Sequence, residues 1–172
     1  MKNYLILGGL IVVAGILINY SFGGFEPIES TMISNPQTII YGRFYEGSHS
    51  SDLLEKQLAD LRKILKDPGN KGTLTIVNYI NATLEQKGMV KQFLGIEGKK
   101  NLPYQAYELD SLVIDAYDGI QIIIPMKPLV MPSPEKLKKL AEKTAEIKGN
   151  KLRGYSIEQY KNQTLVINFP LK

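Results

Sequence analysis

The stretch YSIEQY at residues 155–160, followed after a polar turn by LVINFPL at 165–171, decides the fold. Both runs are rich in β-branched, aromatic and apolar residues, so they predict a β-hairpin that closes the chain. Alternation places Glu158 and Tyr160 on one face of this hairpin and Ile157 on the other. An ionised carboxylate is costly to desolvate without a cation or a hydrogen-bond donor, so we expect Glu158 to be solvated or to meet a partner.

The residues before this hairpin predict a strand and a helix. Ser133 and Pro134 are typical of a helix start, as N-cap and first helical residue, and Gly149 ends the helix. A strand is expected at 112–117, so residues 104–172 form a strand-helix-strand-strand unit. The apolar stretch 120–132 is an insertion with three open interpretations: an additional edge strand, a cover over a pocket, or a surface that touches a bilayer.

The same order of elements is expected in residues 37–97. A strand at 38–45 precedes a helix that begins at Ser51 or Asp52 and carries leucines at helical spacing. Strands at 73–79 and 89–96 follow. The predicted fold class is α+β, with two strand-helix-strand-strand repeats in one antiparallel sheet and the helices on one face. Overlaying the two halves pairs Val77 with Glu158.

The amino terminus predicts a single transmembrane helix. Residues 4–22 are almost purely apolar and long enough for a hydrocarbon core of about 30 Å, which requires about 20 helical residues. Lys2 precedes this segment and acidic residues follow it, which places the amino terminus in the cytoplasm. We therefore predict a signal anchor at 1–23, a linker at 24–36 and a folded domain at 37–172. A cleaved signal peptide and a buried core helix remain alternatives.

Composition narrows the function classes. The chain has 172 residues, no cysteine and a formal net charge of +4, with its basic residues scattered among acidic ones. A thiolate metal site and a cysteine nucleophile are thereby excluded, and no nucleic-acid partner is predicted. His49 is the only histidine and lies in a loop before a helix. We predict no cofactor, no metal site and no catalytic residue.

These features resemble one domain family. The two repeats, the Tyr-acid-Gly steps at 45–47 and 117–119, the Glu-x-Tyr at 158–160 and the apolar-Pro-apolar step at 169–171 are similar to the GyrI-like domain. That family includes gyrase-inhibitor proteins and the effector-binding domains of MerR-type and AraC-type regulators. The resemblance covers residues 37–172, and with the predicted anchor it suggests a membrane-anchored member.

The resemblance implies a groove between the repeats that takes up hydrophobic, often cationic, small molecules. The central acid of the groove would be Glu158, with Tyr160 beside it. Aromatic rings attract cations with roughly 0.5 to 2 kcal/mol each. The remaining candidate ligand-binding residues are tyrosines expected near the groove: Tyr41, Tyr45, Tyr79 and Tyr117.

The leading functional prediction is a protein that binds a hydrophobic or cationic amphiphile without transforming it. It would be held in a bacterial inner membrane with its domain on the periplasmic side. One alternative is a hydrolase that uses Glu158 as base or nucleophile and a tyrosine as acid. Another is a membrane-tethered interaction module whose groove, or segment 120–131, docks a protein; the sequence does not identify a protein partner.

Overall fold

The structure is a computed structural model that describes residues 28–98, 104–126 and 131–172. Eight strands form one sheet in the order β1-β6-β8-β7-β3-β4-β2-β5, and every neighbouring pair is antiparallel. The predicted α+β class with one antiparallel sheet is confirmed. The strands are β1 (Ser30–Asn35), β2 (Thr38–Ser48), β3 (Gly72–Tyr79), β4 (Met89–Gly98), β5 (Asp110–Ile114), β6 (Tyr117–Pro125), β7 (Tyr155–Lys161) and β8 (Thr164–Pro170).

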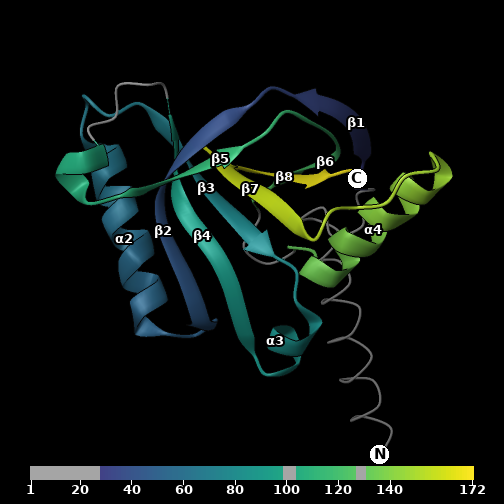
Figure 1. The fold of residues 1–172 in the computed structure, drawn as a ribbon, viewed down its shortest axis with the longest axis horizontal. Helices are drawn as coiled ribbons and strands as arrows, with labels where there is room; N and C mark the ends of the chain where they lie inside the picture. Colours follow the sequence, from purple (N-terminus) through teal and green to yellow (C-terminus); the bar gives the residue numbers. More distant parts are fainter. Residues whose placement is uncertain (1–27, 99–103, 127–130) are drawn as a thin grey trace, which may run out of the picture.

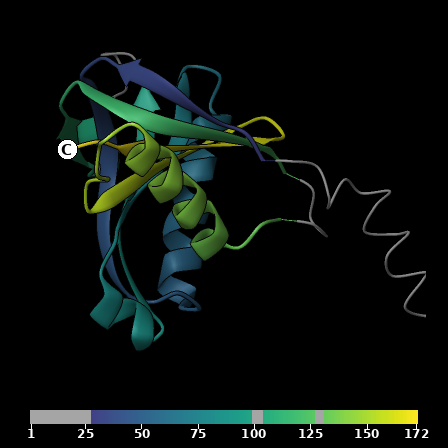
Figure 2. The same cartoon turned by 90° about the vertical axis from the view of Figure 1, so that its right-hand side faces the viewer.

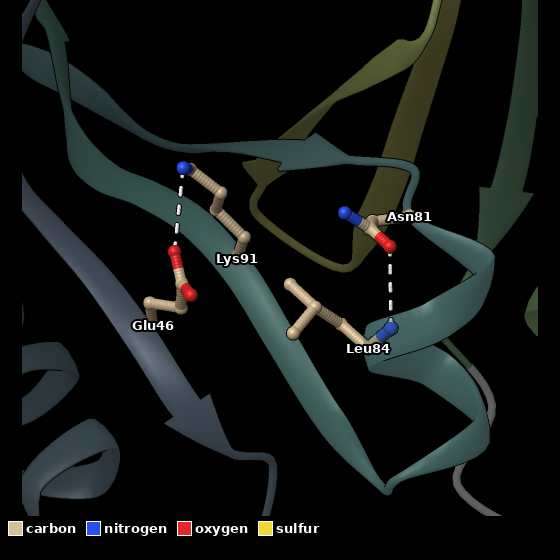
Figure 3. Close-up of polar contacts among 4 residues, drawn as sticks. All are labelled: Glu46, Asn81, Leu84 and Lys91. Carbon is tan, nitrogen blue, oxygen red and sulfur yellow. Dashed lines mark hydrogen bonds and ion pairs between the residues drawn. The ribbon is translucent and has the colours of Figure 1, made fainter.

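Three α-helices lie in the described residues: α2 (Asp52–Lys66), α3 (Ala82–Gln86) and α4 (Pro134–Ile147). The hydroxyl of Ser51 accepts a hydrogen bond from the Leu53 backbone N–H and caps α2, as its position predicts. Ser133 caps α4 through the Lys136 N–H. The short helix α3 was not predicted; its cap is Asn81, whose Oδ1 accepts from the backbone N–H of Leu84 (Figure 3).

The chain repeats the order strand, helix, strand, strand twice. The first copy is β2-α2-β3-β4 and the second is β6-α4-β7-β8. The copies join where β3 pairs with β7, with Ile76 opposite Glu158. Figure 1 shows α2 and α4 on the two sides of this junction, and in Figure 2 α4 lies in front of α2. The junction is therefore the part of the sheet that lies between the two helices.

The first strand of the second copy differs from its prediction. It is β6, which begins at Tyr117 and lies between β1 and β8, whereas residues 112–114 of the predicted strand at 112–117 fall in the edge strand β5. Residues 120–125 are thus part of an inner strand rather than an insertion. Ile120 and Ile122 are fully buried there. Burial alternates along β6, since Ile124 is also buried but Ile123 is 54% exposed, so burial accounts for only one face of this apolar run.

The predicted linker at 24–36 also contains structure. Its residues 30–35 form the edge strand β1, which pairs with β6. Polar and apolar residues are mixed in this strand, so periodicity did not distinguish it from a tether. Within the described residues no helix is long and apolar enough to cross a bilayer. The predicted anchor at 1–23 lies outside them.

The sheet curls strongly. Only Asp115 and Ala116 separate the edge strand β5 from β6, which lies next to the other edge, so the two edges must approach each other. Strands β2 and β4 approach each other closely where Gly42 pairs with Gly95. A Cβ on Gly95 would lie 2.6 Å from the Tyr41 carbonyl oxygen. The face without α2 and α4, hereafter the far face, holds its own buried cluster: Ile40, Val77, Phe93, Ile114, Tyr117 and Ile157.

Candidate functional site

Glu158 lies on the helix-bearing face of β7, at the junction of the two repeats. Its neighbour on the same face, Tyr160, packs against the buried clusters beneath both α2 and α4. The Tyr160 hydroxyl donates to Glu158 Oε2 at 3.0 Å. The predicted pair is therefore formed, and it occupies the position between the helices.

A chain of amides supports the other carboxylate oxygen. Asn78 on β3 donates from Nδ2 to Glu158 Oε1 at 2.7 Å. Gln92 on β4 donates from Nε2 to Asn78 Oδ1 at 2.6 Å. These side chains come from neighbouring strands and share one face, since Asn78 is in register with Gln92. The network holds Glu158 in one orientation with neutral donors only.

Burial determines the electrostatics of this pair. Desolvation raises the pKa of Glu158, and the hydrogen bonds from Tyr160 and Asn78 oppose that shift without cancelling it. Desolvation also raises the pKa of Tyr160, and the adjacent carboxylate adds to the effect. The ion pair found within the described residues joins Lys91 and Glu46 at 3.3 Å from strands β4 and β2 (Figure 3), not Glu158. Glu158 thus gains hydrogen bonds from the fold but no salt bridge in the described part of the chain.

Of the predicted tyrosines, Tyr41 and Tyr45 share the helix-bearing face with Glu158. Both are buried in the cluster under α2, against which Tyr160 packs. The Tyr45 hydroxyl donates to the Ser48 carbonyl oxygen at 2.6 Å, which turns its polar end toward the end of β2. These two rings lie in the first-repeat core next to the site.

Tyr79 and Tyr117 lie on the far face. The Tyr79 ring centroid is 6.4 Å from that of Tyr155 and 6.1 Å from that of Phe44. Tyr117 is buried with Val77, and this burial raises its pKa to about 12. The six predicted residues therefore do not line a single site, because the sheet separates these two tyrosines from Glu158.

The overlay of Val77 with Glu158 is wrong by one residue. Val77 is fully buried on the far face, whereas Glu158 is on the helix-bearing face. The first-repeat residue that meets the carboxylate is Asn78. A one-residue shift in register moves a side chain to the other face of the sheet, and periodicity alone did not fix that register.

Sequence reasoning missed the amides of Asn78 and Gln92. A usable signal existed: each is a polar residue at a position where alternation along an apolar strand predicts a buried side chain. It also missed Glu97, which accepts from Thr38 Oγ1 at 3.0 Å and from the Gln159 amide on the far face. The described residues contain no group of three or more metal-ligating side chains.

The site is closed. Two surface pockets of the described structure lie between α2 and the sheet and at the carboxyl end of α4, and Glu158 lines neither. Tyr160 is mostly buried between the clusters of the two repeats.

Solved structures share this architecture. The C-terminal domain of EcmrR matches with a TM-score of 0.57 and 16% identity, over 84% of this chain and 98% of that one. The chain has a GyrI-like fold. SAV2435 bound to tetraphenylphosphonium matches with a TM-score of 0.52 and 9% identity, over 84% and 94%. A hydrolase from Listeria innocua encoded by lin2189 matches with a TM-score of 0.59 and 11% identity, over 90% and 98%. No protein-family model and no curated protein sequence matches the chain.

Proposed function

We propose that this domain binds a hydrophobic cation or cationic amphiphile between its two repeats, with Glu158 as the acid that meets the positive charge. The observation that carries the proposal is a mostly buried carboxyl group held by Tyr160 and Asn78. Neutral donors orient a carboxylate without neutralising it. A cation that reaches the Glu158 carboxylate would supply the positive counter-charge. In a medium of low dielectric the attraction between the two charges is stronger than in water.

The surroundings of Glu158 suit an apolar ligand. The clusters beneath α2 and α4 meet at Tyr160 and are otherwise built largely from leucine, isoleucine and alanine. Movement of Tyr160 away from Oε2 would expose the carboxylate and open a space between these clusters. The tyrosine ring would then offer its face to the cation.

The likeness to SAV2435 bound to tetraphenylphosphonium supports this choice of ligand class. That compound is a lipophilic cation, which is the chemistry a buried acid in an apolar groove would select. At this identity the likeness establishes the fold alone, so the ligand class for this chain rests on Glu158.

The predicted anchor at 1–23 is part of the proposal. A domain tethered to a bacterial inner membrane on the periplasmic side would meet amphiphiles that concentrate at the bilayer surface. The apolar run of residues 4–22 supports this arrangement. A protease-accessibility assay on intact spheroplasts tests it: cleavage of the domain from outside is expected, and full protection would contradict it.

Matched ions test the charge recognition. Tetraphenylphosphonium and tetraphenylborate have nearly the same shape and opposite charge. We expect the phosphonium to raise the melting temperature of the wild-type protein, and Glu158→Gln to abolish most of this rise. An equal shift in both proteins, or an equal response to the borate, would refute recognition by the carboxylate.

A hydrolase remains a second candidate, favoured by one observation. The Tyr160 hydroxyl and Glu158 form a hydrogen-bonded acid-base pair, the arrangement in which a carboxylate acts as base or nucleophile and a phenol as acid. Fold neighbours include a hydrolase. Turnover of reactive electrophiles that disappears in both Glu158→Gln and Tyr160→Phe would establish this activity, whereas stoichiometric binding without product would argue against it.

A further inference from the structure

A pocket of about 530 Å³ lies on the flank of α2 that faces away from Glu158. Leu61 and Ile64 of α2 line it, whereas Arg62 of the same helix and Glu158 do not. The 3₁₀-helix η1 (Tyr104–Tyr107) lies beside this helix (Figure 1). The volume is in the range of small-molecule sites, about 300 to 1,000 Å³. This pocket is separate from the Glu158 site.

Tyr107 adds an aromatic side chain to the lining of the pocket, whereas the buried floor is aliphatic. It consists of Leu61 and Ile64 from α2, Leu94 from β4 and Leu109 just before β5. Leu61, Leu94 and Leu109 are buried and belong to the cluster under α2. Flat aromatic ligands usually meet aromatic walls, but this floor has branched alkyl side chains. It therefore suits an alkyl chain.

Arg43 and Tyr107 supply hydrogen-bond donors to the lining of the pocket. Arg43 Nη2 donates to the Tyr107 carbonyl oxygen at 2.9 Å and Nε to the Glu108 carbonyl oxygen at 3.4 Å. These bonds fix the guanidinium while leaving some of its five N–H groups for another acceptor. The Tyr107 hydroxyl accepts from Asn70 Nδ2 at 3.0 Å, so its own proton can be donated.

A buried amide oxygen in the same pocket lacks a partner. Gln57 lines the pocket, and its Oε1 is buried without a hydrogen-bond partner in the described structure. Because a half-turn of the amide exchanges its oxygen and nitrogen, Gln57 can offer either an acceptor or a donor to a bound group. Such an orphaned polar atom is costly unless a ligand or water meets it.

The charges around the pocket favour an anion. Arg43, Lys63 and Lys66 line it together with the carboxylates of Asp60 and Asp67. Asp67 is partly engaged, since its Oδ1 accepts from the Gly69 backbone N–H at 3.0 Å. The basic residues outnumber the acidic ones, and the fixed guanidinium has the fork geometry that matches a carboxylate.

We propose that this pocket binds an aliphatic carboxylate of the fatty-acid type. Arg43 donates to the carboxylate, Gln57 bonds the same polar end, and the alkyl chain covers the leucines of the floor. This site would prefer the opposite charge from the site proposed at Glu158. The inference does not depend on the function proposed for Glu158.

Isothermal titration of the full-length protein tests the proposal with decanoate and decyltrimethylammonium, which share a chain length and differ in charge. Decanoate is expected to bind, and Arg43→Gln to weaken it about tenfold or more, since a charge-assisted contact is lost. Arg153→Gln is the matched control: Arg153 Nε also donates to a backbone carbonyl, that of Leu171 at 2.8 Å, but lies outside this pocket. It should leave decanoate binding unchanged.

Arg43 also holds η1 in place through its backbone contacts, so Arg43→Gln can weaken binding by loosening η1. A second variant that leaves Arg43 intact is therefore needed. Gln57→Leu keeps the guanidinium contacts and is expected to weaken decanoate several-fold. The proposal is overturned if wild-type protein fails to bind decanoate, if neither variant changes its affinity, or if Arg43→Gln weakens decyltrimethylammonium as much. Failure of the Glu158 proposal would appear separately, as equal tetraphenylphosphonium binding by wild type and Glu158→Gln.

Discussion

Removing the Tyr160 hydroxyl should destabilise the protein by an amount that depends on pH. In Tyr160→Phe the ring stays in the core and only the 3.0 Å hydrogen bond to Glu158 Oε2 is lost. Such a bond contributes roughly 1.5 to 3 kcal/mol when its acceptor is charged and roughly 0.5 to 1.5 kcal/mol when both partners are neutral. The cost of the substitution therefore reports the ionisation state of Glu158.

The pH window follows from the direction of the Glu158 shift. Burial raises its pKa above the ordinary value of 4.5 in the folded protein. Below that ordinary value the carboxyl group is neutral in both folded and unfolded protein, so the smaller cost applies. Above the raised pKa the folded protein carries the carboxylate, and the larger cost applies. The loss should grow by about 1 kcal/mol or more across this interval.

Urea unfolding followed by far-ultraviolet circular dichroism, at about pH 4 and at a pH above the raised Glu158 pKa, measures this difference. Tyr45→Phe is the matched control, because its hydroxyl donates to the uncharged Ser48 carbonyl oxygen from the same core. Its cost should be the same at both values. The reasoning is refuted if Tyr160→Phe loses the same free energy of unfolding at both pH values. It is also refuted if Tyr160→Phe loses less than Tyr45→Phe at the higher pH.

Three further predictions concern the same framework. Because the folded-state pKa of Glu158 is raised, its stabilising contribution is complete below pH 4.5 and declines as pH rises through the folded pKa; Glu158→Gln should flatten this decline in denaturation curves taken across that range. Asn78→Leu should cost about 2 to 4 kcal/mol, because it leaves both Gln92 and one Glu158 oxygen unpaired, and an unchanged urea midpoint would contradict the network. Gly95→Ala should cost more than about 3 kcal/mol, since its Cβ would lie 2.6 Å from a backbone oxygen. Gly149→Ala, which has a φ of 71° but no atom within 4 Å, should cost about 1 kcal/mol; thermal melts showing equal losses would refute the packing argument at Gly95.

Most of the fold could be predicted from local signals. Capping serines, leucines at helical spacing and the hairpin at 155–171 have short-range physical causes, so Ser51 and Ser133 begin helices where expected. The strand β1 and the start of β6 could not be placed, because they are defined by pairing with each other across a long sequence separation. The sequence of β1 mixes polar and apolar residues, and that of β6 is almost continuously apolar. Neither shows the alternation of polar and apolar residues by which a strand is predicted.

The candidate site was only partly predictable. Alternation and motif together placed Glu158 and Tyr160 on one face, and the structure brings them within hydrogen-bond distance. The sequence did not show which face of β3 meets them, so Val77 was chosen where Asn78 makes the contact. The same one-residue shift misplaced Tyr79, because alternation along β3 puts Tyr79 on the far face with Val77 and not with Asn78.

The central claim is that Glu158 meets the charge of a lipophilic cation. Calorimetric titration of tetraphenylphosphonium into the full-length protein, at a pH above the raised Glu158 pKa, tests it most directly. The account predicts that Glu158→Gln increases the dissociation constant about tenfold or more, since the ligand loses its counter-charge while shape and volume are kept. Equal dissociation constants for the two proteins would contradict the claim.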